Sequence, residues 1–257
     1  MIKLIYDIVI IGAGNLAWQL TKELKHYGQN IVQVYNRSLT NAKELSKQIN
    51  CEYTSDINCI DKTADIYFIL TSDRAISDIS KKLNLRNKFV VHSSGSINLN
   101  KIQFKRRGVF YPLQTFSKNT KVDFKQIPIC IETNTKKDYK ILLTIANLMS
   151  NHVIQVNSKD RQIIHMAAVF ANNFTNYMYV ISNEILKNNK INFKILHPLI
   201  NETNKKIRNN TPKKSQTGPA LRQDFKIIRK HLSLLDNKQH KKIYKILSLN
   251  ISKKISK

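Results

Sequence analysis

A glycine-rich segment near the start of the chain has the spacing of a phosphate-binding loop. The sequence GAGNLA at residues 12–17 follows an apolar run at 4–11 and precedes a stretch with leucines four residues apart. Gly12 would permit a tight turn, Gly14 would let the backbone approach a pyrophosphate, and Ala17 would let a helix pack closely on a strand. Because the start of such a helix attracts anions, the motif predicts a dinucleotide-binding loop, with an unliganded glycine-rich turn as the alternative. The residues expected to bind the cofactor here are Gly12, Gly14, Asn15, Leu16 and Ala17.

The end of the second predicted strand, at 31–35, bears on the choice of cofactor. NAD-specific sites usually place an aspartate or glutamate there, which binds the ribose hydroxyls. This chain has Asn36, Arg37 and Ser38 instead. Two hydrogen-bonding side chains and a planar cation suit a 2′-phosphate, so we expect NADP as the cofactor, with NAD less favoured. The alternative is that Arg37 is a surface residue that stacks on an adenine or contacts no ligand.

Two further polar segments follow predicted strands. Residues 71–73, Thr-Ser-Asp, come after a strand at 65–70, and residues 92–95, His-Ser-Ser-Gly, end a strand at 88–92. In a parallel sheet both segments lie at the carboxyl edge, where ligands bind. Asp73 can equally be a plain helix cap. The residues expected to contact the cofactor or a substrate are Thr71, Ser72, His92, Ser93, Ser94 and Gly95.

The elements that would position these residues alternate between strand and helix. Such an alternation predicts a parallel sheet with right-handed crossovers, that is, an α/β Rossmann domain with a mainly parallel sheet. Strands are expected at 4–11, 31–35, 65–70, 88–92, 108–111, 128–132 and 152–156. Helices are expected after the glycine-rich loop, from Ser38 or Thr40 to about residue 49, at 73–83 and at 136–150.

The pattern changes after about residue 157, where no further strand is expected. Helices are predicted at 160–186, 194–207, 224–235 and 238–255. We therefore predict a Rossmann-like NADP-binding domain at 1–157, followed by an all-α substrate and dimerisation domain at 158–257. The stretch 162–183 lacks acidic and basic residues and is long enough to span a bilayer, but its many polar side chains predict a helix buried within protein and no membrane segment.

Composition restricts the functional classes. The chain has 257 residues, a net charge of +26 and three cysteines, Cys51, Cys59 and Cys130. Their odd number and wide spacing predict neither a disulfide scaffold nor a cysteine-based metal site, and no metal is expected. Because Asp7 interrupts the first apolar run, no signal peptide is expected, and the prediction is a cytoplasmic protein. Most basic residues are dispersed lysines, which favours a solvated surface over nucleic-acid binding.

Three further segments, together with the GAGNLA loop and the HSSG segment at 92–95, point to a family. They are FYPLQT at 110–115, the run from His165 to Asn176, and QTGPALRQD at 216–224. The chain resembles, over essentially its whole length, a bacterial family of Rossmann-like NADP oxidoreductases whose C-terminal half is a domain of unknown function. It is more distantly similar to pyrroline-5-carboxylate reductase, ketopantoate reductase and the β-hydroxyacid dehydrogenases. The resemblance implies a helical domain that dimerises and closes the active site.

The same resemblance directs attention to the first long helix after the Rossmann domain. In the β-hydroxyacid dehydrogenases this helix carries a catalytic lysine and, about one turn later, an asparagine. Here Asn172 and Asn173 are preceded by Ala168 and Val169, so that lysine is absent. The nearest titratable side chain is His165, which could serve as a general acid near neutral pH. Steps of three and four place it on one helix face with the candidates for orienting a substrate, Asn173 and Asn176. The alternative is a buried histidine bonded to a backbone carbonyl.

The segment at 216–224 is expected to be a loop that leads into a helix. Arg222 could bind a substrate carboxylate through two parallel hydrogen bonds. Alternatively, Arg222 pairs with Asp224 or Glu202 and braces the loop. Asp224 or Thr217 could cap the following helix, with Pro219 near its start. The residues expected to bind substrate are Arg222, Asp224, Gln216 and Thr217.

The sequence thus predicts an NADP-dependent oxidoreductase that transfers hydride to or from a small carbonyl, imine or hydroxy-acid substrate. The alternative is a non-catalytic NADP-binding sensor or scaffold, which the absent lysine favours. A homodimer formed through the helical domain is expected, because the predicted helix at 163–186 is apolar on nearly all sides.

Overall fold

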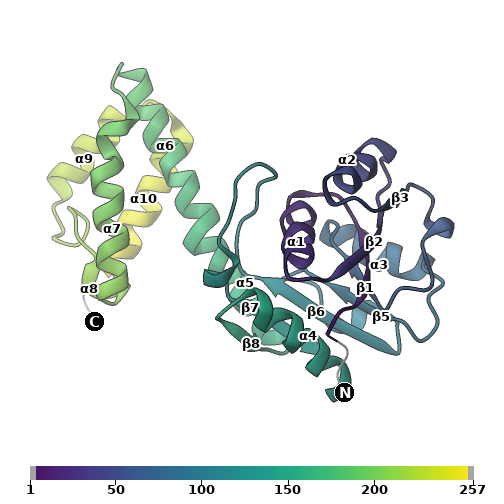
Figure 1. Ribbon diagram of the computed structural model, residues 1–257. Helices are drawn as coiled ribbons and strands as arrows, with labels where there is room; N and C mark the ends of the chain where they lie inside the picture. Colours follow the sequence, from purple (N-terminus) through teal and green to yellow (C-terminus); the bar gives the residue numbers. More distant parts are fainter. Residues whose placement is uncertain (1–3, 254–257) are drawn as a thin grey trace. The chain divides into compact units, whose positions relative to one another are not determined.

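An eight-stranded sheet with the order β3-β2-β1-β4-β5-β6-β7-β8 organises the first part of the computed structural model, which describes residues 4–253 (Figure 1). All neighbouring strands are parallel except β6 and β7, which are antiparallel. The predicted Rossmann fold with a mainly parallel sheet is therefore confirmed. The strands are β1 (Asp7–Ile11), β2 (Asn30–Tyr35), β3 (Glu52–Thr54), β4 (Ile66–Ile69), β5 (Phe89–His92), β6 (Arg106–Pro112), β7 (Ile129–Thr133) and β8 (Val153–Gln155).

The continuous apolar run of β1 is explained by helices or turns on both faces of the sheet. Ile8 and Ile10 pack with α1, α2 and α4 on one face, whereas Val9 and Ile11 pack with α3 and short 3₁₀ turns on the other. The helices of this unit are α1 (Asn15–His26), α2 (Leu39–Ile49), α3 (Asp73–Lys82), α4 (Lys136–Met149) and α5 (Ser158–Ala168). The 3₁₀ turns are Ile57–Cys59, Leu99–Lys101 and Phe124–Gln126.

Three features of the sheet differ from the sequence predictions. Leu4 and Ile5 are exposed and β1 begins only at Asp7, because apolar residue type alone does not mark where sheet pairing starts. The edge strand β3 was not predicted, since three residues, two of them exposed, carry no periodic signal. The antiparallel pairing of β6 and β7 follows from the connection between them, which contains a 3₁₀ turn and no crossover helix.

The chain divides into two compact units, one that ends at Val169 and one that begins at Phe170. The sequence placed the domain boundary after residue 157, which is one helix earlier. Helix α5 accounts for the difference, because its Ser158 and Arg161 side chains are buried against the sheet unit. The functional roles assigned to 1–157 and 158–257 stay predictions.

The described part of the second unit contains helices and no strand, as the all-α prediction requires. The single helix predicted at 160–186 is instead α5, a π-helical segment (Val169–Phe174) and α6 (Thr175–Asn188). Because π-helical hydrogen bonds join residues five apart, the α-helical spacing predicted for His165, Asn173 and Asn176 does not hold across this segment. The remaining elements are a 3₁₀ turn (Phe193–Leu196), α7 (His197–Asn209), α8 (Pro212–Ser215), α9 (Phe225–Leu234) and α10 (Lys238–Lys253).

The predicted helix at 238–255 is α10, and the last two predicted residues lie outside the described part. Across residues 4–253, no helix is long and apolar enough to cross a membrane. The same residues contain no cluster of three or more histidine, cysteine or acidic side chains arranged to hold a metal ion.

Candidate functional site

The loop between β1 and α1 forms a cradle with space for an anion. Gly12 has φ +123°, and a Cβ atom there would lie 2.3 Å from the backbone oxygen of Leu70, so only glycine fits. A Cβ on Gly14 would meet no atom within 4 Å, so this side of the loop is open. Gly14 also precedes α1 with no side-chain cap on the helix amides. The amides and the helix dipole therefore suit the pyrophosphate of a dinucleotide, and the residues present fit that group.

A cleft of about 710 Å³ extends from this loop along the carboxyl edge of the sheet. Gly12, Gly14, Asn15 and Leu16 line it, and their role in binding a cofactor stays a prediction, whereas Ala17 is buried in the core, where it lets α1 pack on the sheet. Asn36 and Arg37, which follow β2, also line the cleft, as does Asn41 of α2. Lys82, at the end of α3, is a further lining residue. Asn36 and Arg37 thus lie where the ribose end of a dinucleotide would bind.

Ser38 lies outside this cleft lining and has a structural partner. Its Oγ accepts a hydrogen bond from the backbone N–H of Asn41 at 3.4 Å and caps α2. The Asn36 side chain donates to the Ser38 carbonyl at 3.1 Å, which stiffens the turn that carries Arg37. The cofactor role predicted for Ser38 stays a prediction, whereas the capping role predicted for it is confirmed.

Thr71 and Ser72, which follow β4, also line the cleft. Ser72 is the N-cap residue of α3 but makes no side-chain cap hydrogen bond, so its hydroxyl is available to a ligand. The Thr71 hydroxyl is buried and has no hydrogen-bond partner among residues 4–253. An unsatisfied buried hydroxyl beside a cleft is expected where a ligand supplies the missing partner.

The loop after β5 is buried and held by its own backbone. His92 Nδ1 accepts a hydrogen bond from Ser94 N–H at 3.1 Å, while the amides of Ser96 and Ile97 both donate to Ser94 Oγ at 3.0 Å. Burial, and secondarily the positive charge of Arg161, lowers the pKa of His92 to about 3, so this histidine is neutral at physiological pH. Within the described residues, His92 Nε2 and Ser93 Oγ have no hydrogen-bond partner.

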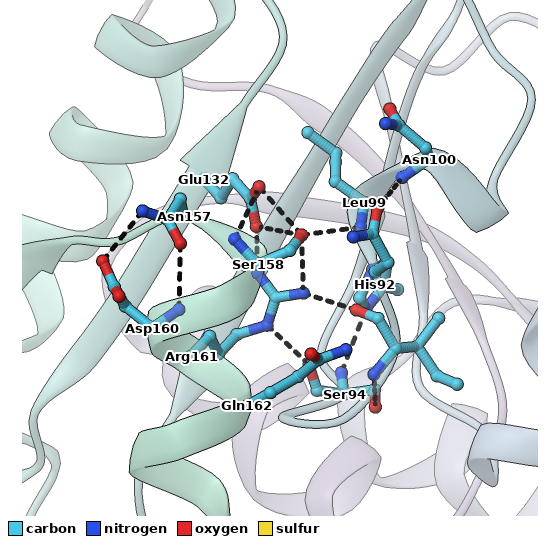
Figure 2. Close-up of polar contacts among 12 residues, drawn as sticks. His92, Ser94, Leu99, Asn100, Glu132, Asn157, Ser158, Asp160, Arg161 and Gln162 are labelled. Atoms are coloured by element: carbon cyan, nitrogen blue, oxygen red, sulfur yellow. Dashed lines mark hydrogen bonds and ion pairs between the residues drawn. The ribbon is translucent and has the colours of Figure 1, made fainter.

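A buried arginine of α5 fixes this loop to the sheet. Arg161 is fully buried, and its guanidinium pairs with Glu132 of β7 (Figure 2). The same guanidinium donates to the carbonyl of Ser94 at 3.1 Å and to the carbonyl of Ile97. A buried charge is tolerated only when it is paired and hydrogen-bonded, and both conditions hold here. Arg161 therefore clamps residues 94–97.

The first turn of α5 adds to this clamp. Ser158 donates from its N–H and Oγ to Glu132 at 3.0 and 2.9 Å, and its Oγ accepts from the Leu99 amide at 3.0 Å. One turn later, Gln162 donates to the Ser96 carbonyl at 2.7 Å. Figure 2 shows that these side chains surround the loop from the helix side. The position of α5 relative to the loop after β5 is thereby fixed at several points.

This arrangement brings His165 to the same sheet edge as the loop after β5. A Cβ atom on Gly95 would lie 2.7 Å from Cγ of His165, so the imidazole is in close contact with the loop. The His165 Nδ1 atom lies 3.0 Å from the hydroxyl of Tyr111, at the end of β6. Burial raises the pKa of Tyr111 to about 12, so the phenol keeps its proton at neutral pH. His165 thus has a side-chain partner rather than the backbone carbonyl of the structural alternative.

The candidates of the second unit form a separate group. Asn173 lies in the π-helical segment and Asn176 in the first turn of α6, and both are exposed. π-helical turns are often found at functional sites. How these amides contribute to a site with His165 stays a prediction.

The predicted substrate loop at 216–224 turns before α9. Asp224 accepts from the Ile227 amide at 3.1 Å and caps α9, which confirms the capping role expected of Asp224. The helix begins at Phe225, so Pro219 lies in the preceding turn rather than near the helix start. Arg222 is exposed and forms no ion pair within residues 4–253, so neither alternative partner, Asp224 or Glu202, holds it. Gln216 and Thr217 are also exposed.

Several residues that build the site were not predicted. Tyr111 belongs to the FYPLQT segment, which supported the family resemblance but gave no prediction of a role for Tyr111. Arg161 and Glu132 gave no signal, because a charged residue on a helix or strand is most often solvated. Asn41 in the first turn of α2 and Lys82 at the end of α3 gave no signal either, because a polar residue on a helix is most often solvated. The missed residues are Tyr111, Arg161, Glu132, Ser158, Asn41 and Lys82.

Two family models match different parts of the chain. Residues 7–94 match the model of a family described as coenzyme F420-dependent NADP oxidoreductase, and residues 127–251 match a domain of unknown function, DUF2520. A "putative NADP oxidoreductase" from Bacteroides fragilis is 40% identical, with a TM-score of 0.92 over 97% of this chain and 99% of that one. No curated protein matches the chain.

Two more distant structures share the fold. A protein from Thermotoga maritima is 22% identical, with a TM-score of 0.78 over 96% of this chain and 99% of that chain. A 1-pyrroline-5-carboxylate reductase from Streptococcus pyogenes is 14% identical, with a TM-score of 0.62 over 99% and 95% of the respective chains. The resemblance stated from the motifs is confirmed over the whole chain. The protein belongs to the family that joins an NADP-oxidoreductase-type Rossmann domain to a C-terminal DUF2520 domain.

Proposed function

We propose that the protein is an NADP(H)-dependent oxidoreductase that acts on a small carbonyl, imine or hydroxy-acid substrate. The observation that carries the proposal is the contact of His165 with Gly95 and with the Tyr111 hydroxyl 3.0 Å away. This contact puts a proton-carrying pair beside the loop after β5, at the edge of the sheet where the dinucleotide cleft opens. A hydride-transfer enzyme needs a proton source at that edge.

The cleft supports NADP over NAD. Arg37 and Lys82 supply positive charge, Asn36 and Asn41 supply amides, and no aspartate or glutamate ends β2. A planar guanidinium can bind the 2′-phosphate of NADP through two hydrogen bonds. The uncharged ribose hydroxyls of NAD would gain little binding free energy from the same guanidinium. Asp78 also lines the cleft and is the only carboxylate among the described lining residues.

Bound at this cleft, the nicotinamide would supply or accept the hydride. Protonated His165 donates through Nδ1–H to the Tyr111 oxygen and gives its Nε2 proton to the substrate oxygen or nitrogen. Tyr111 remains a phenol because its pKa is about 12, so it orients the imidazole without competing as an acid at neutral pH. His92 stays neutral because burial lowers its pKa, and its role is to hold the loop beside the reacting groups.

The second unit would contribute substrate binding and dimer contacts. We assign to Arg222 the binding of a substrate carboxylate, with Gln216, Thr217 and Asp224 shaping the loop, and to Asn173 and Asn176 the orientation of polar groups.

Large apolar side chains of the second unit such as Phe170, Ile195, Leu199 and Leu234 are at least 60% exposed. Such surface needs cover, which a second copy of the chain would provide. Light scattering at low micromolar concentration should show about 60 kDa, and a particle of about 30 kDa would reject the dimer.

A non-catalytic NADP-binding sensor or scaffold is the second candidate. Ala168 and Val169 stand where the related dehydrogenases carry their lysine, which favours this reading. Both candidates bind NADPH, so substrate turnover is the property that distinguishes them.

The test follows NADPH oxidation with a panel of aldehydes, ketones, cyclic imines and 2-oxo acids. The proposal predicts substrate-dependent oxidation that falls by about 10²-fold or more in His165→Asn, while NADPH affinity stays within about twofold. The matched control is His231→Asn, a histidine in the second unit that contacts Tyr244, and we expect it to keep full turnover. Binding of NADPH with no oxidation by any class would favour the sensor, and unchanged turnover in His165→Asn would remove His165 from the proposal.

A further inference from the structure

A second cavity, of about 500 Å³, lies at the opposite edge of the sheet from the dinucleotide cleft. It opens where β4, β5 and β6 begin, and the first turns of α4 complete its wall. Its charged lining consists of Arg86, Lys88, Arg106, Lys137, Lys140 and Asp65. Among the described residues, none lines both this cavity and the dinucleotide cleft, so the cavity is a separate place on the same unit.

Two of the cations are held in place by the protein. Arg106 donates from Nε and Nη2 to Asp138 at 2.9 and 2.6 Å, and its guanidinium lies 5.4 Å from the centre of the Phe89 ring. Lys88 donates to the carbonyls of Thr63 and Ala64, both at 2.9 Å. These contacts fix both positive charges whether or not a ligand is present. Preorganised charge of this kind lowers the cost of binding an anion.

The other three cations line the same cavity and have no neutralising partner among residues 4–253. Arg86, Lys137 and Lys140 are exposed, and their side chains form no hydrogen bond or ion pair with another described residue. Counting Asp65 and the Arg106 partner Asp138, the cations that residues 4–253 bring to this cavity exceed their carboxylates by three. Like charges gathered around one hollow repel each other, and a bound anion relieves that repulsion.

The general abundance of lysine does not account for this cluster. The chain has only nine arginines against 34 lysines, and two of the nine line this one cavity. A dispersed lysine surface also does not explain why Arg106 is held by a buried carboxylate and an aromatic ring. Arginine is the side chain best suited to phosphoryl oxygens, because its planar fork binds two of them at once.

From these observations we infer that the cavity bounded by Arg86, Lys88, Arg106 and Lys140 is a second anion site, which binds a small ligand carrying two phosphoryl groups. The excess of three positive charges matches the charge of a pyrophosphate group near neutral pH. The concave shape and limited volume favour a small molecule over a nucleic-acid strand. The site does not depend on the proposed hydride chemistry, since none of its residues lines the dinucleotide cleft.

The test is a calorimetric titration of the full chain with inorganic pyrophosphate in a magnesium-free buffer of low ionic strength, with saturating NADPH present. We expect one pyrophosphate per chain, and at least a tenfold loss of affinity in Arg86→Ala/Lys140→Ala. The matched control Lys226→Ala/Lys230→Ala removes the same charge from α9 and should change the affinity by less than twofold. Arg37→Ala, in the dinucleotide cleft, should also leave it unchanged.

Arg86 and Lys140 are exposed, so the double variant should fold, and Lys140→Glu offers a second route to the same loss. No binding of pyrophosphate would overturn the inference. Equal losses in the α9 control would mean that net charge, and no particular site, attracts the anion. Displacement of pyrophosphate by NADPH, or its loss in Arg37→Ala, would place the anion in the dinucleotide cleft. Binding of an RNA homopolymer but not of pyrophosphate would also contradict it.

Discussion

Arg161 in α5 and Glu132 in β7 form an ion pair in which the guanidinium is fully buried and the carboxylate side chain is 14% exposed. Because the same guanidinium bonds the carbonyls of Ser94 and Ile97, the pair links the helix, the sheet and the loop after β5. His165 lies one turn further along α5. The position of His165, the proposed proton donor, therefore depends on the Arg161–Glu132 ion pair, to which we assign no contact with substrate.

Removing this arginine should destabilise the whole first unit. Arg161→Ala leaves Glu132 without its cation and two carbonyls without donors, and losses of about 3–5 kcal/mol are typical for one partner of a buried pair. Urea unfolding should show this loss, whereas the exposed control Arg229→Ala should stay within about 0.5 kcal/mol of wild type. Arg161→Met/Glu132→Gln should lose less than Arg161→Ala alone, since no charge remains buried. A double variant at least as unstable as the single one would show that the charge is not the cause.

The two loop glycines should separate folding from binding. Gly12→Ala places a Cβ 2.3 Å from a backbone oxygen at a φ of +123°, so it should destabilise the protein strongly. Gly14→Ala has open space around its Cβ and an ordinary φ of −80°, so stability should change by no more than about 1 kcal/mol. Its methyl group would nevertheless occupy the space for the pyrophosphate, and NADPH affinity should fall at least tenfold. Wild-type affinity in Gly14→Ala would place the dinucleotide elsewhere.

Cofactor preference should depend on Arg37. A lost charge-assisted hydrogen bond costs about 1.5–3 kcal/mol, which corresponds to tenfold or more in affinity. Fluorescence titrations should therefore show weaker NADPH binding in Arg37→Ala with NADH binding nearly unchanged. Lys43→Ala, an exposed lysine on α2, is the control for net charge. Equal affinities of the wild type for NADPH and NADH would refute the assignment of NADP.

The buried His92 should make stability depend on pH. Burial lowers its pKa to about 3 in the folded protein, whereas an unfolded histidine titrates near 6.5. Between these two pH values, His92 therefore binds a proton in the unfolded state but not in the folded state. The stability from this residue is fully present above about pH 6.5 and is lost, by up to about 1.4 kcal/mol per pH unit, as the pH falls toward 3.

Urea unfolding between pH 7 and 4.5 measures this effect. His92→Gln should show a shallower pH dependence than the wild type, because one linked proton is gone. His26→Gln, on the exposed end of α1, is the matched control and should keep the wild-type slope. An unchanged slope in His92→Gln would mean that His92 titrates normally in the folded protein.

The sequence was most informative where function depends on local spacing. The GAGNLA loop could be identified because a tight turn and a close phosphate approach require glycines at fixed positions in consecutive residues. The strands β1, β4 and β5 could be predicted for a similar reason, since buried parallel strands are continuous apolar runs. The capping role of Asp224 is likewise a local effect.

The contacts that assemble the candidate site could not be predicted in this way. Tyr111 and His165 are 54 residues apart, and Arg161 and Glu132 are 29 apart, so no short pattern records their meeting. Arginine is also seldom fully buried, which makes a solvated Arg161 the natural expectation. The π-helical segment had no signal either, because residues 160–186 have the composition of an ordinary buried helix.

The most direct test of this account is a crystal structure of the protein grown with NADPH. We predict electron density for the cofactor in the cleft between the GAGNLA loop and α3, with the pyrophosphate at the amides of α1 and the 2′-phosphate at Arg37. The nicotinamide ring should lie beside residues 92–95, within reach of a substrate that also contacts His165. Density for the cofactor at another part of the molecule, or a nicotinamide directed away from His165, would contradict the account.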